Sequence, residues 1–219
     1  AVRCAVVGCH LVHAGHPGIY SGASLMNWTT RNPWHGDLRR WLQAPGSLSA
    51  RLAVTGQRFG VQVLDQGRCP LRPDEAHALG APGQRIGYAR EVVLRVDERA
   101  MVFARTVTLH LNSKGAWRSL RGLGTRPLAN VLFTRSGITR QPLAYSRLPR
   151  SSPLQRHVAA RWQSATGVDL TRQALAARRS VFTRRGRSLL VMEVFAAPTR
   201  QWDWHGAALT LQELRRKMA

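Results

Sequence analysis

Two strand-like stretches in the middle of the chain constrain the fold more than any other feature. Residues 86–96 and 101–109 are rich in β-branched and other apolar side chains, and only a few polar residues separate them. Two such stretches joined by so short a connection predict an antiparallel β-hairpin. A second pair of stretches, residues 180–184 and 188–196, predicts another hairpin near the end of the chain.

Helical patterns lie between these strands rather than in strict alternation with them. Leu38, Trp41 and Leu42 share one face of a short helix, and Ser47 can cap a second helix over residues 48–54. Hairpins with helices between them predict an α+β fold, built as a single antiparallel β-sheet with flanking helices. Further elements are expected as a strand from residue 59 to 63, a loop with one helical turn at 67–84, and helical segments at 117–124, 128–133 and 154–175, the last interrupted around Gly167.

Composition changes near both ends of the chain. The first 25 residues are rich in Gly, His and Ala, and a stretch of different character opens at Met26. They lack the basic start and long apolar stretch of a signal peptide. We therefore expect residues 1–25 to be an extension outside the domain, residues 26–204 to form one domain, and residues 205–219 to be a tail or an extra helix.

The chain is strongly basic, with 33 Lys and Arg against 11 Asp and Glu and a net charge of +22. Such a charge is typical of proteins that meet nucleic acid, an anionic membrane surface or an anionic substrate. Here nearly all of it comes from arginines spread along the whole chain, because Lys114 and Lys217 are the only lysines. This bias is also what a GC-rich coding sequence produces. No helix-turn-helix, zinc-finger or aromatic RNA-binding pattern accompanies it, so we expect no specific nucleic-acid partner.

Other absences in the sequence narrow the class of protein. No run of 18 or more apolar residues occurs, so we expect no transmembrane segment. The three cysteines, Cys4, Cys9 and Cys69, do not make a disulfide framework, which fits a reducing compartment and a cytoplasmic protein. The Cys and His spacing matches no standard zinc site, and we find no nucleotide-binding motif and no catalytic triad. We therefore predict neither a metal nor a cofactor.

Two charged residues lie among apolar neighbours on predicted strands. Arg90 shares a strand face with Val92 and Leu94, and Glu193 is the only charge within residues 189–196. A buried charge is costly unless it is paired. Either the two residues form an ion pair, or both line a pocket. In a pocket the planar guanidinium of Arg90 would hold a carboxylate, and Glu193 would meet a hydroxyl.

Arg105 is a further candidate. It lies on a strand whose face with Met101, Phe103 and Val107 is predicted to point inward, and it could bind a second anion there. A structural arginine whose hydrogen bonds are satisfied within the fold would give the same pattern.

At these same positions the sequence resembles the bacterial chorismate–pyruvate lyase family. The resemblance covers roughly residues 36–198, and its five parts occur in family order. They are Trp41-Leu42 with residues 46–49, then 89–94, 104–107, 123–133 and 190–198. Two positions depart from the family pattern, since Leu48 stands where many relatives carry Met and Thr108 replaces a frequent Pro. Neither departure affects Arg90 or Glu193.

The resemblance implies an enzyme that converts chorismate to 4-hydroxybenzoate and pyruvate, the first step toward the ubiquinone ring, without a cofactor. It implies that Arg90 holds the ring carboxylate and that Glu193 faces the ring hydroxyl. Leu48 and Leu128 would contact the ligand through main-chain groups and apolar surface, and Arg105 or another arginine would meet the second carboxylate. The expected partner is this small-molecule substrate, bound by a monomer.

A second class of function stays open at this point. The same fold can serve as a non-catalytic domain that binds or senses aromatic acids. Such domains usually come attached to a DNA-binding helix-turn-helix, and this sequence shows none, which favours the enzyme. A chorismate assay would separate the two.

Overall fold

The computed structural model describes residues 27–133, 136–150, 152–198 and 201–204. The expected extension (1–25) and tail (205–219) lie outside these residues. Within the described ranges the longest helix has 14 residues, and none is long and apolar enough to cross a membrane. In chain order the elements are α1 (Gly36–Gln43), α2 (Leu48–Leu52), β1 (Phe59–Pro70), α3 (Pro73–Ala78), β2 (Ile86–Val96), β3 (Arg99–Leu109), a 3-10 turn (Arg118–Leu120), α4 (Ala129–Leu132), β4 (Ile138–Arg140), β5 (Ala144–Leu148), α5 (Pro153–Thr166), β6 (Leu175–Arg184) and β7 (Arg187–Phe195).

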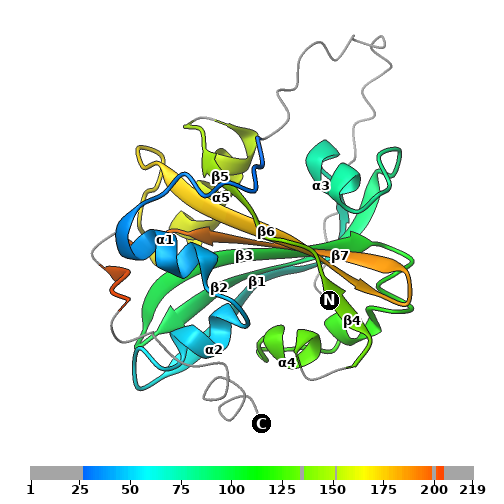
Figure 1. Ribbon diagram of the computed structural model, residues 1–219, viewed down its shortest axis with the longest axis horizontal. Coiled ribbons are helices and arrows are strands. Elements are labelled where there is room, and N and C mark those ends of the chain that lie inside the picture. Colours follow the sequence, from blue (N-terminus) through cyan, green and yellow to red (C-terminus); the bar gives the residue numbers. More distant parts are fainter. Residues whose placement is uncertain (1–26, 134–135, 151, 199–200, 205–219) are drawn as a thin grey trace, which may run out of the picture.

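The seven strands of the described chain form one antiparallel sheet in the order β1-β2-β3-β7-β6-β4, and β5 pairs with β6 beside β4 (Figure 1). Both predicted hairpins are confirmed, as β2–β3 and β6–β7. Their two-residue turns, Asp97-Glu98 and Arg185-Gly186, all have positive φ. Paired positive φ angles give the turn twist that matches the right-handed twist of the flanking strands. The predicted α+β class with a single antiparallel sheet is therefore confirmed.

Helices cover both faces of this sheet. On one face the side chains of α1 and α2 pack with Val92, Leu94 and Phe195. On the other face α5 packs against alternate residues of the same strands, including Val93 and Val194. Figure 1 shows α1, α2 and α4 on the near side of the sheet and α5 behind it. Consequently every central strand is buried on both sides, and a charge on either face needs a partner.

Several strands are longer, and several helices shorter, than predicted. β1 runs to Pro70, into the segment expected to be a loop, and the one helical turn expected in that segment is the short helix α3. Helix α5 ends at Thr166 because Gly167, with φ +75°, caps it in the left-handed conformation. β6 then begins at Leu175 rather than at residue 180. The helix expected at residues 117–124 reduces to a single 3-10 turn at Arg118–Leu120.

Candidate active site

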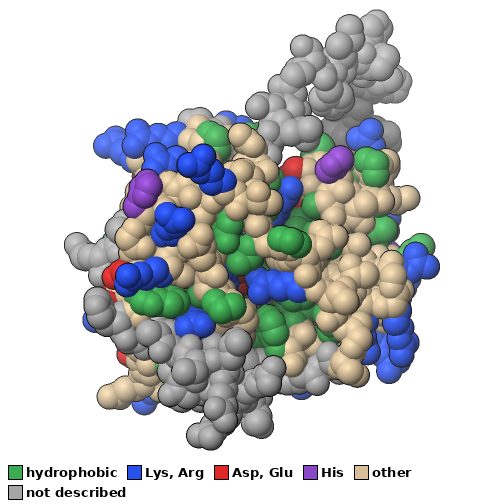
Figure 2. Space-filling view, viewed as in Figure 1, with side chains coloured by type: hydrophobic (Ala, Val, Ile, Leu, Met, Phe, Trp, Pro, Cys, Tyr) green, Lys and Arg blue, Asp and Glu red, His purple; other side chains and the backbone are tan. Residues whose placement is uncertain are grey.

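A cavity lies between the α1–α2 face of the sheet and the starts of α2 and α4. Its floor comes from strands β1, β2, β3, β7 and β6, and its walls from the segments 46–49, 127–133 and 140–143. Near the middle of the face drawn in Figure 2, hydrophobic and cationic side chains lie side by side, and acidic side chains are few. The charged residues of the lining are Arg90, Arg140, Arg178 and Glu193.

The strand register brings the floor residues together. Residues directly opposite each other in an antiparallel pair share a face of the sheet, so pairing across several strands builds a row of side chains. Two adjacent rows point into the cavity. One is Arg90, Thr106, Val191 and Ser180, and the other is Val92, Ala104, Glu193 and Arg178.

Arg90 is a buried cation with no acidic partner among the described residues. It is 3% exposed. Its Nη1 donates to Gln66 Oε1 and its Nη2 to the Gly124 carbonyl, each at 2.6 Å. Both acceptors are neutral, and burial lowers the pKa of the Arg90 guanidinium. A carboxylate entering the cavity would offset this desolvation.

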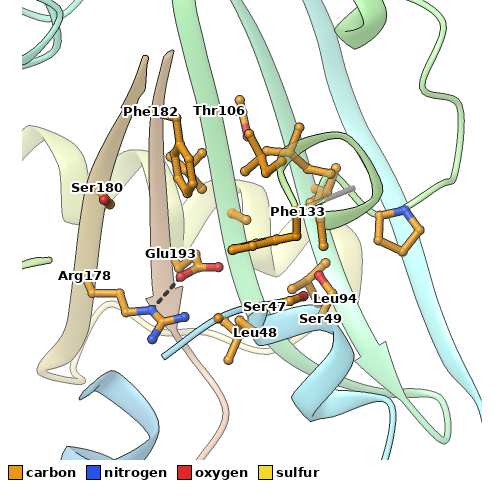
Figure 3. A pocket seen from close by; sticks show the side chains of 18 of the residues that line it. Ser47, Leu48, Ser49, Leu94, Thr106, Phe133, Arg178, Ser180, Phe182 and Glu193 are labelled. Carbon is orange, nitrogen blue, oxygen red and sulfur yellow. Dashed lines mark hydrogen bonds and ion pairs between the residues drawn. The ribbon is translucent and has the colours of Figure 1, made fainter. Parts of the chain in front are cut away.

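Glu193 is paired with Arg178, not with Arg90. Arg178 Nε donates to Glu193 Oε2 at 2.6 Å (Figure 3), so the Arg90–Glu193 ion pair considered from the sequence is wrong. Arg178 is 1% exposed, and its Nη1 also donates to the carbonyls of Trp41, Leu42 and Ala44. These carbonyls lie at the C-terminal end of α1, where the last carbonyls of a helix lack their usual i+4 partners. Oε1 of Glu193 makes no hydrogen bond to a described residue and lies at the cavity.

Arg140 is the third cation of the lining. Its Nε donates to Ser180 Oγ at 3.2 Å, its Nη1 to the Gly46 carbonyl at 3.4 Å, and its guanidinium stacks on the Phe182 ring with 5.2 Å to the centroid. Burial and the nearby charge of Arg178 lower the pKa of Arg140, while Glu193 opposes this shift. No ion pair joins Arg140 to an acidic residue of the described chain.

Leu48 and Leu128 stand at the starts of the two helices that close the cavity, and both line it. Ser47 caps α2, because its hydroxyl accepts from the Ala50 amide at 3.1 Å, as predicted from the sequence. The first amides of a helix have no acceptor within the helix. The main-chain N–H groups at Leu48 and Leu128 are therefore available to a ligand in the cavity.

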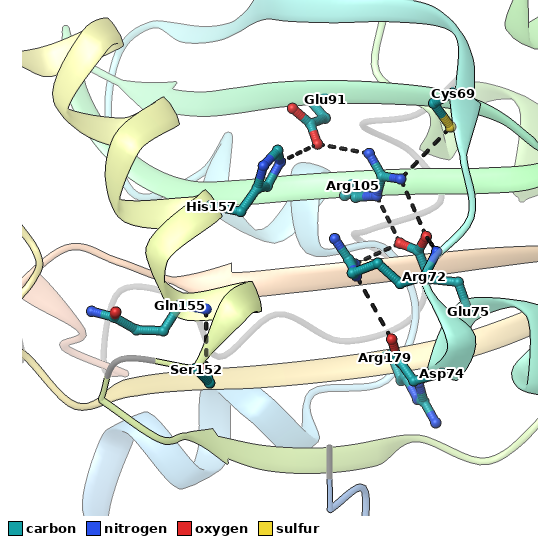
Figure 4. Close-up of polar contacts among 10 residues, drawn as sticks. All are labelled: Cys69, Arg72, Asp74, Glu75, Glu91, Arg105, Ser152, Gln155, His157 and Arg179. Atoms are coloured by element: carbon teal, nitrogen blue, oxygen red, sulfur yellow. Dashed lines mark hydrogen bonds and ion pairs between the residues drawn. The ribbon is translucent and has the colours of Figure 1, made fainter. Parts of the chain in front are cut away.

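Arg105 lies on the opposite face of the sheet, because it pairs with Glu91, the neighbour of Arg90. Its Nε donates to Glu75 Oε1 at 2.7 Å and its Nη1 to Glu91 Oε1 at 2.8 Å (Figure 4). Both carboxylates are 1% exposed. Arg105 therefore does not line the cavity, where a second anion was suggested to bind to it. Its surroundings match the alternative considered from the sequence, an arginine whose hydrogen bonds are satisfied within the fold. The face that carries Glu91 is buried as well, under α3 and α5.

This buried network makes the stability of the protein depend on acid pH. Burial alone would raise the pKa of Glu91, but the hydrogen bond from His157 and the charges of His157 and Arg105 outweigh it and lower the pKa to about 2. The pKa of Glu75 is also lowered, since Arg105 and Arg72 overcome the effect of its burial. A lowered folded-state pKa contributes stability above the unfolded pKa of about 4.3 and loses it as the pH falls toward 2.

We therefore expect the free energy of unfolding to fall between about pH 5 and pH 2, and to fall less steeply in Glu91→Gln, which lacks one of the titrating groups. Urea unfolding across a pH series measures both slopes. Equal slopes in the two proteins would show that Glu91 does not carry this dependence.

Arg140 and Arg178 were not predicted from the sequence as cavity residues. Both lie on short or late-starting strands whose apolar alternation is weak. Near the start of β6 both faces carry one Ala and one Arg, so neither face stands out as the buried one. Gln66, which accepts a hydrogen bond from Arg90, lies in β1 beyond the end of the strand expected at residues 59–63.

The cavity as a whole suits a small, flat, largely apolar molecule that carries negative charge. Most of its lining is aliphatic or aromatic, and two of its three cations have no acidic partner in the described chain. Glu193 Oε1 offers a hydrogen-bond acceptor at the side of the cavity near Arg178. Within the described residues no group of three or more His, Cys, Asp or Glu side chains is placed to hold a metal ion.

Comparisons with known proteins find a matching family profile, relatives of similar sequence and a solved structure of partly similar fold. The sequence profile described as "Chorismate lyase" matches residues 34–206. A protein of Albidiferax ferrireducens named "Probable chorismate pyruvate-lyase" is 60% identical over 177 residues, which cover 81% of this chain and 90% of that protein. A protein of the same name from Azoarcus sp. is 43% identical over 79% of this chain and 92% of its own length. A solved structure titled "Crystal structure of PhnF C-terminal domain" gives a TM-score of 0.48 at 18% identity, over 67% of this chain and 87% of that chain.

Proposed function

The chain belongs to the chorismate lyase family, and on this premise we propose that it converts chorismate to 4-hydroxybenzoate and pyruvate, and so supplies the ring precursor of ubiquinone. One observation supports this substrate most strongly. The cavity holds two buried or partly buried guanidinium groups, those of Arg90 and Arg140, without an acidic partner among the described residues. Chorismate carries two carboxylates, so its charge complements that of the cavity.

In the proposed complex Arg90 binds the carboxylate on the ring. A guanidinium can donate two parallel hydrogen bonds to a carboxylate, and the neutral partners of Arg90 leave its charge available. Glu193 accepts a hydrogen bond from the ring hydroxyl through Oε1. The amides of Leu48 and Leu128 and their apolar side chains contact the ring from the helix side.

The reaction needs little assistance once the substrate is held. The C4–H bond breaks, its electron pair completes the aromatic ring, and the C3–O bond breaks to release enolpyruvate. The proton lost from C4 is balanced by the proton that the enolpyruvate gains as it becomes pyruvate. Aromatisation drives the step, so the protein has to orient the substrate and stabilise negative charge that develops on the departing oxygen. Fixed cations in a largely apolar cavity are suited to both tasks.

The proposal is tested by mixing the purified protein with chorismate and measuring both products. We expect 4-hydroxybenzoate and pyruvate in equal amounts, at a rate proportional to the protein concentration. A protein that binds 4-hydroxybenzoate but leaves chorismate unchanged would instead be an aromatic-acid binding domain of the same fold.

Glu193→Gln is expected to weaken binding of 4-hydroxybenzoate about 10-fold, because the hydroxyl loses an ionised acceptor. Benzoate lacks the hydroxyl, so its affinity should change by less than about 2-fold. Calorimetric titration of wild type and variant with both ligands gives the four dissociation constants. The variant should also unfold at a lower temperature, because Arg178 loses its only acidic partner in the described chain.

The two ligands serve as each other's control. If both affinities fell by the same factor, the substitution would be acting through Arg178 and the end of α1, and the direct role of Glu193 would be wrong.

A further inference from the structure

The charges of the cavity lining do not cancel. Glu193 neutralises Arg178 through a 2.6 Å contact, and these two residues lie side by side in one row of the sheet. Arg90 and Arg140 remain without an acidic partner among the described residues. Because such groups are costly to desolvate, the excess of two positive charges points to a ligand with two negative groups.

The surroundings of Arg140 are built to hold a guanidinium in place. The side chain stacks on Phe182 and donates to the hydroxyl of Ser180 and to the Gly46 carbonyl. Ser180 Oγ is itself fixed, since it donates to the Gln141 carbonyl at 2.6 Å. Nη2 of Arg140 makes no hydrogen bond to a described residue. All the partners are neutral, so they orient the cation without cancelling its charge.

Arg140 and Arg90 approach the cavity from different sides. Arg90 is on β2, and Arg140 is on β4, opposite Phe182 of β6. Four interstrand steps of about 4.8 Å separate β2 from β4. The row that contains Glu193 and Arg178 crosses β7 and β6 between them. Both side chains nevertheless line the same cavity, so a dianionic ligand held by Arg90 would turn its second charge toward Arg140, the other lining cation without an acidic partner in the described chain.

Two other buried arginines are less suitable for binding a second carboxylate. Arg178 is already neutralised by Glu193 and donates to three carbonyls at the end of α1. Arg105 is on the opposite face of the sheet and is bound by two glutamates.

We propose that Arg140 is a specificity-determining residue that binds the carboxylate of the departing enolpyruvyl group. This inference rests on the proposed function, since it takes chorismate as the substrate. It also predicts that chorismate and 4-hydroxybenzoate depend differently on Arg140. 4-Hydroxybenzoate carries one carboxylate, held by Arg90, so its affinity is independent of Arg140, whereas the recognition of chorismate requires both arginines.

The test compares Arg140→Gln with Arg147→Gln. Glutamine removes the charge of Arg140 but keeps a donor for Ser180 or Gly46. Arg147 is an exposed arginine of neighbouring β5, stacked on Trp34 outside the cavity, so its substitution removes the same charge elsewhere. We expect Arg140→Gln to lower kcat/KM for chorismate about 10–100-fold, with the dissociation constant of 4-hydroxybenzoate within about 2-fold of wild type. Arg147→Gln should match wild type in both measurements.

A parallel loss of chorismate turnover and 4-hydroxybenzoate affinity in Arg140→Gln would overturn the proposal, because it would show that Arg140 only positions the Gly46–Leu48 segment. Unchanged kcat/KM in Arg140→Gln would also overturn it.

A binding measurement that needs no turnover separates this inference from the proposed function. The probe is 3-(carboxymethoxy)-4-hydroxybenzoate, which carries a second carboxylate on an ether at the ring position of the enolpyruvyl group. Wild type should bind this dianion more tightly than Arg140→Gln does, by about 10-fold or more. Failure of wild type to convert chorismate would refute the proposed function, whereas equal affinity of both proteins for the probe would refute the role of Arg140 alone.

Discussion

Replacing Arg90 with alanine is expected to lower kcat/KM for chorismate by about 10²–10⁴-fold and to remove most of the affinity for 4-hydroxybenzoate. In the proposed complex this substitution removes two charge-assisted hydrogen bonds to the ring carboxylate in a largely apolar cavity. No other group of the described chain presents a forked cation at that point of the cavity. Steady-state kinetics with chorismate and calorimetry with 4-hydroxybenzoate measure the two losses.

Arg90→Lys should recover little of this activity. A lysine ammonium is a point charge, and it cannot make two parallel bonds to a carboxylate while also bonding to Gln66 and the Gly124 carbonyl. A lysine variant with near-normal kcat/KM would show that charge alone suffices and that the bidentate arrangement is wrong.

Arg105→Ala is expected to destabilise the fold by about 3 kcal/mol, because Glu75 and Glu91 lose their shared buried cation and keep only the more exposed partners Arg72, His157 and Arg161. The lost ion pairs join α3, β2 and β3, and they lie on the face of the sheet opposite the cavity. Urea unfolding at neutral pH measures the destabilisation directly.

Arg90 and Arg105 form a matched pair of experiments. Both are buried arginines of adjacent strands, 3% and 7% exposed, but they point to opposite faces of the sheet. Arg90→Ala should mainly lower kcat/KM, and Arg105→Ala should mainly lower the free energy of unfolding. The folded fraction of Arg105→Ala should keep its affinity for 4-hydroxybenzoate. If Arg105→Ala abolished ligand binding in a protein that remained folded, the separation of the two faces would be mistaken.

The parts of the site that could be predicted from the sequence depend on strong strand alternation. Arg90 and Glu193 stand out because each is a charge among apolar residues on a long strand, and both line the cavity. The two hairpins followed from the same alternation and from their short turns. Leu48 and Leu128 came from the family resemblance, and the structure places both at the cavity. Their roles toward the ligand stay predictions.

The partners of these residues could not be predicted, for physical reasons. The start of β6, Leu175 to Arg179, is rich in Ala and Arg, which have high helix propensity, and only pairing with β5 and β7 makes it a strand. Because of this composition, Arg178 was not recognised as a strand residue, and the partner of Glu193 could not be predicted. Arg140 is on a strand of three residues, too short to show a period. The burial of Glu91 on the other face of β2 could not be predicted, because α5, which covers this face, is distant in the sequence and α3 was expected only as one helical turn.

We propose that the aromatic product forms in this cavity, with its carboxylate at Arg90 and its hydroxyl at Glu193. A crystal structure of the protein with 4-hydroxybenzoate would show whether this is so. We expect both carboxylate oxygens to lie within hydrogen-bond distance of the Arg90 guanidinium and the hydroxyl to lie at Glu193 Oε1. A ligand bound on the Arg105 face of the sheet, or one that turns its carboxylate toward Arg140 and its hydroxyl toward Arg90, would contradict it.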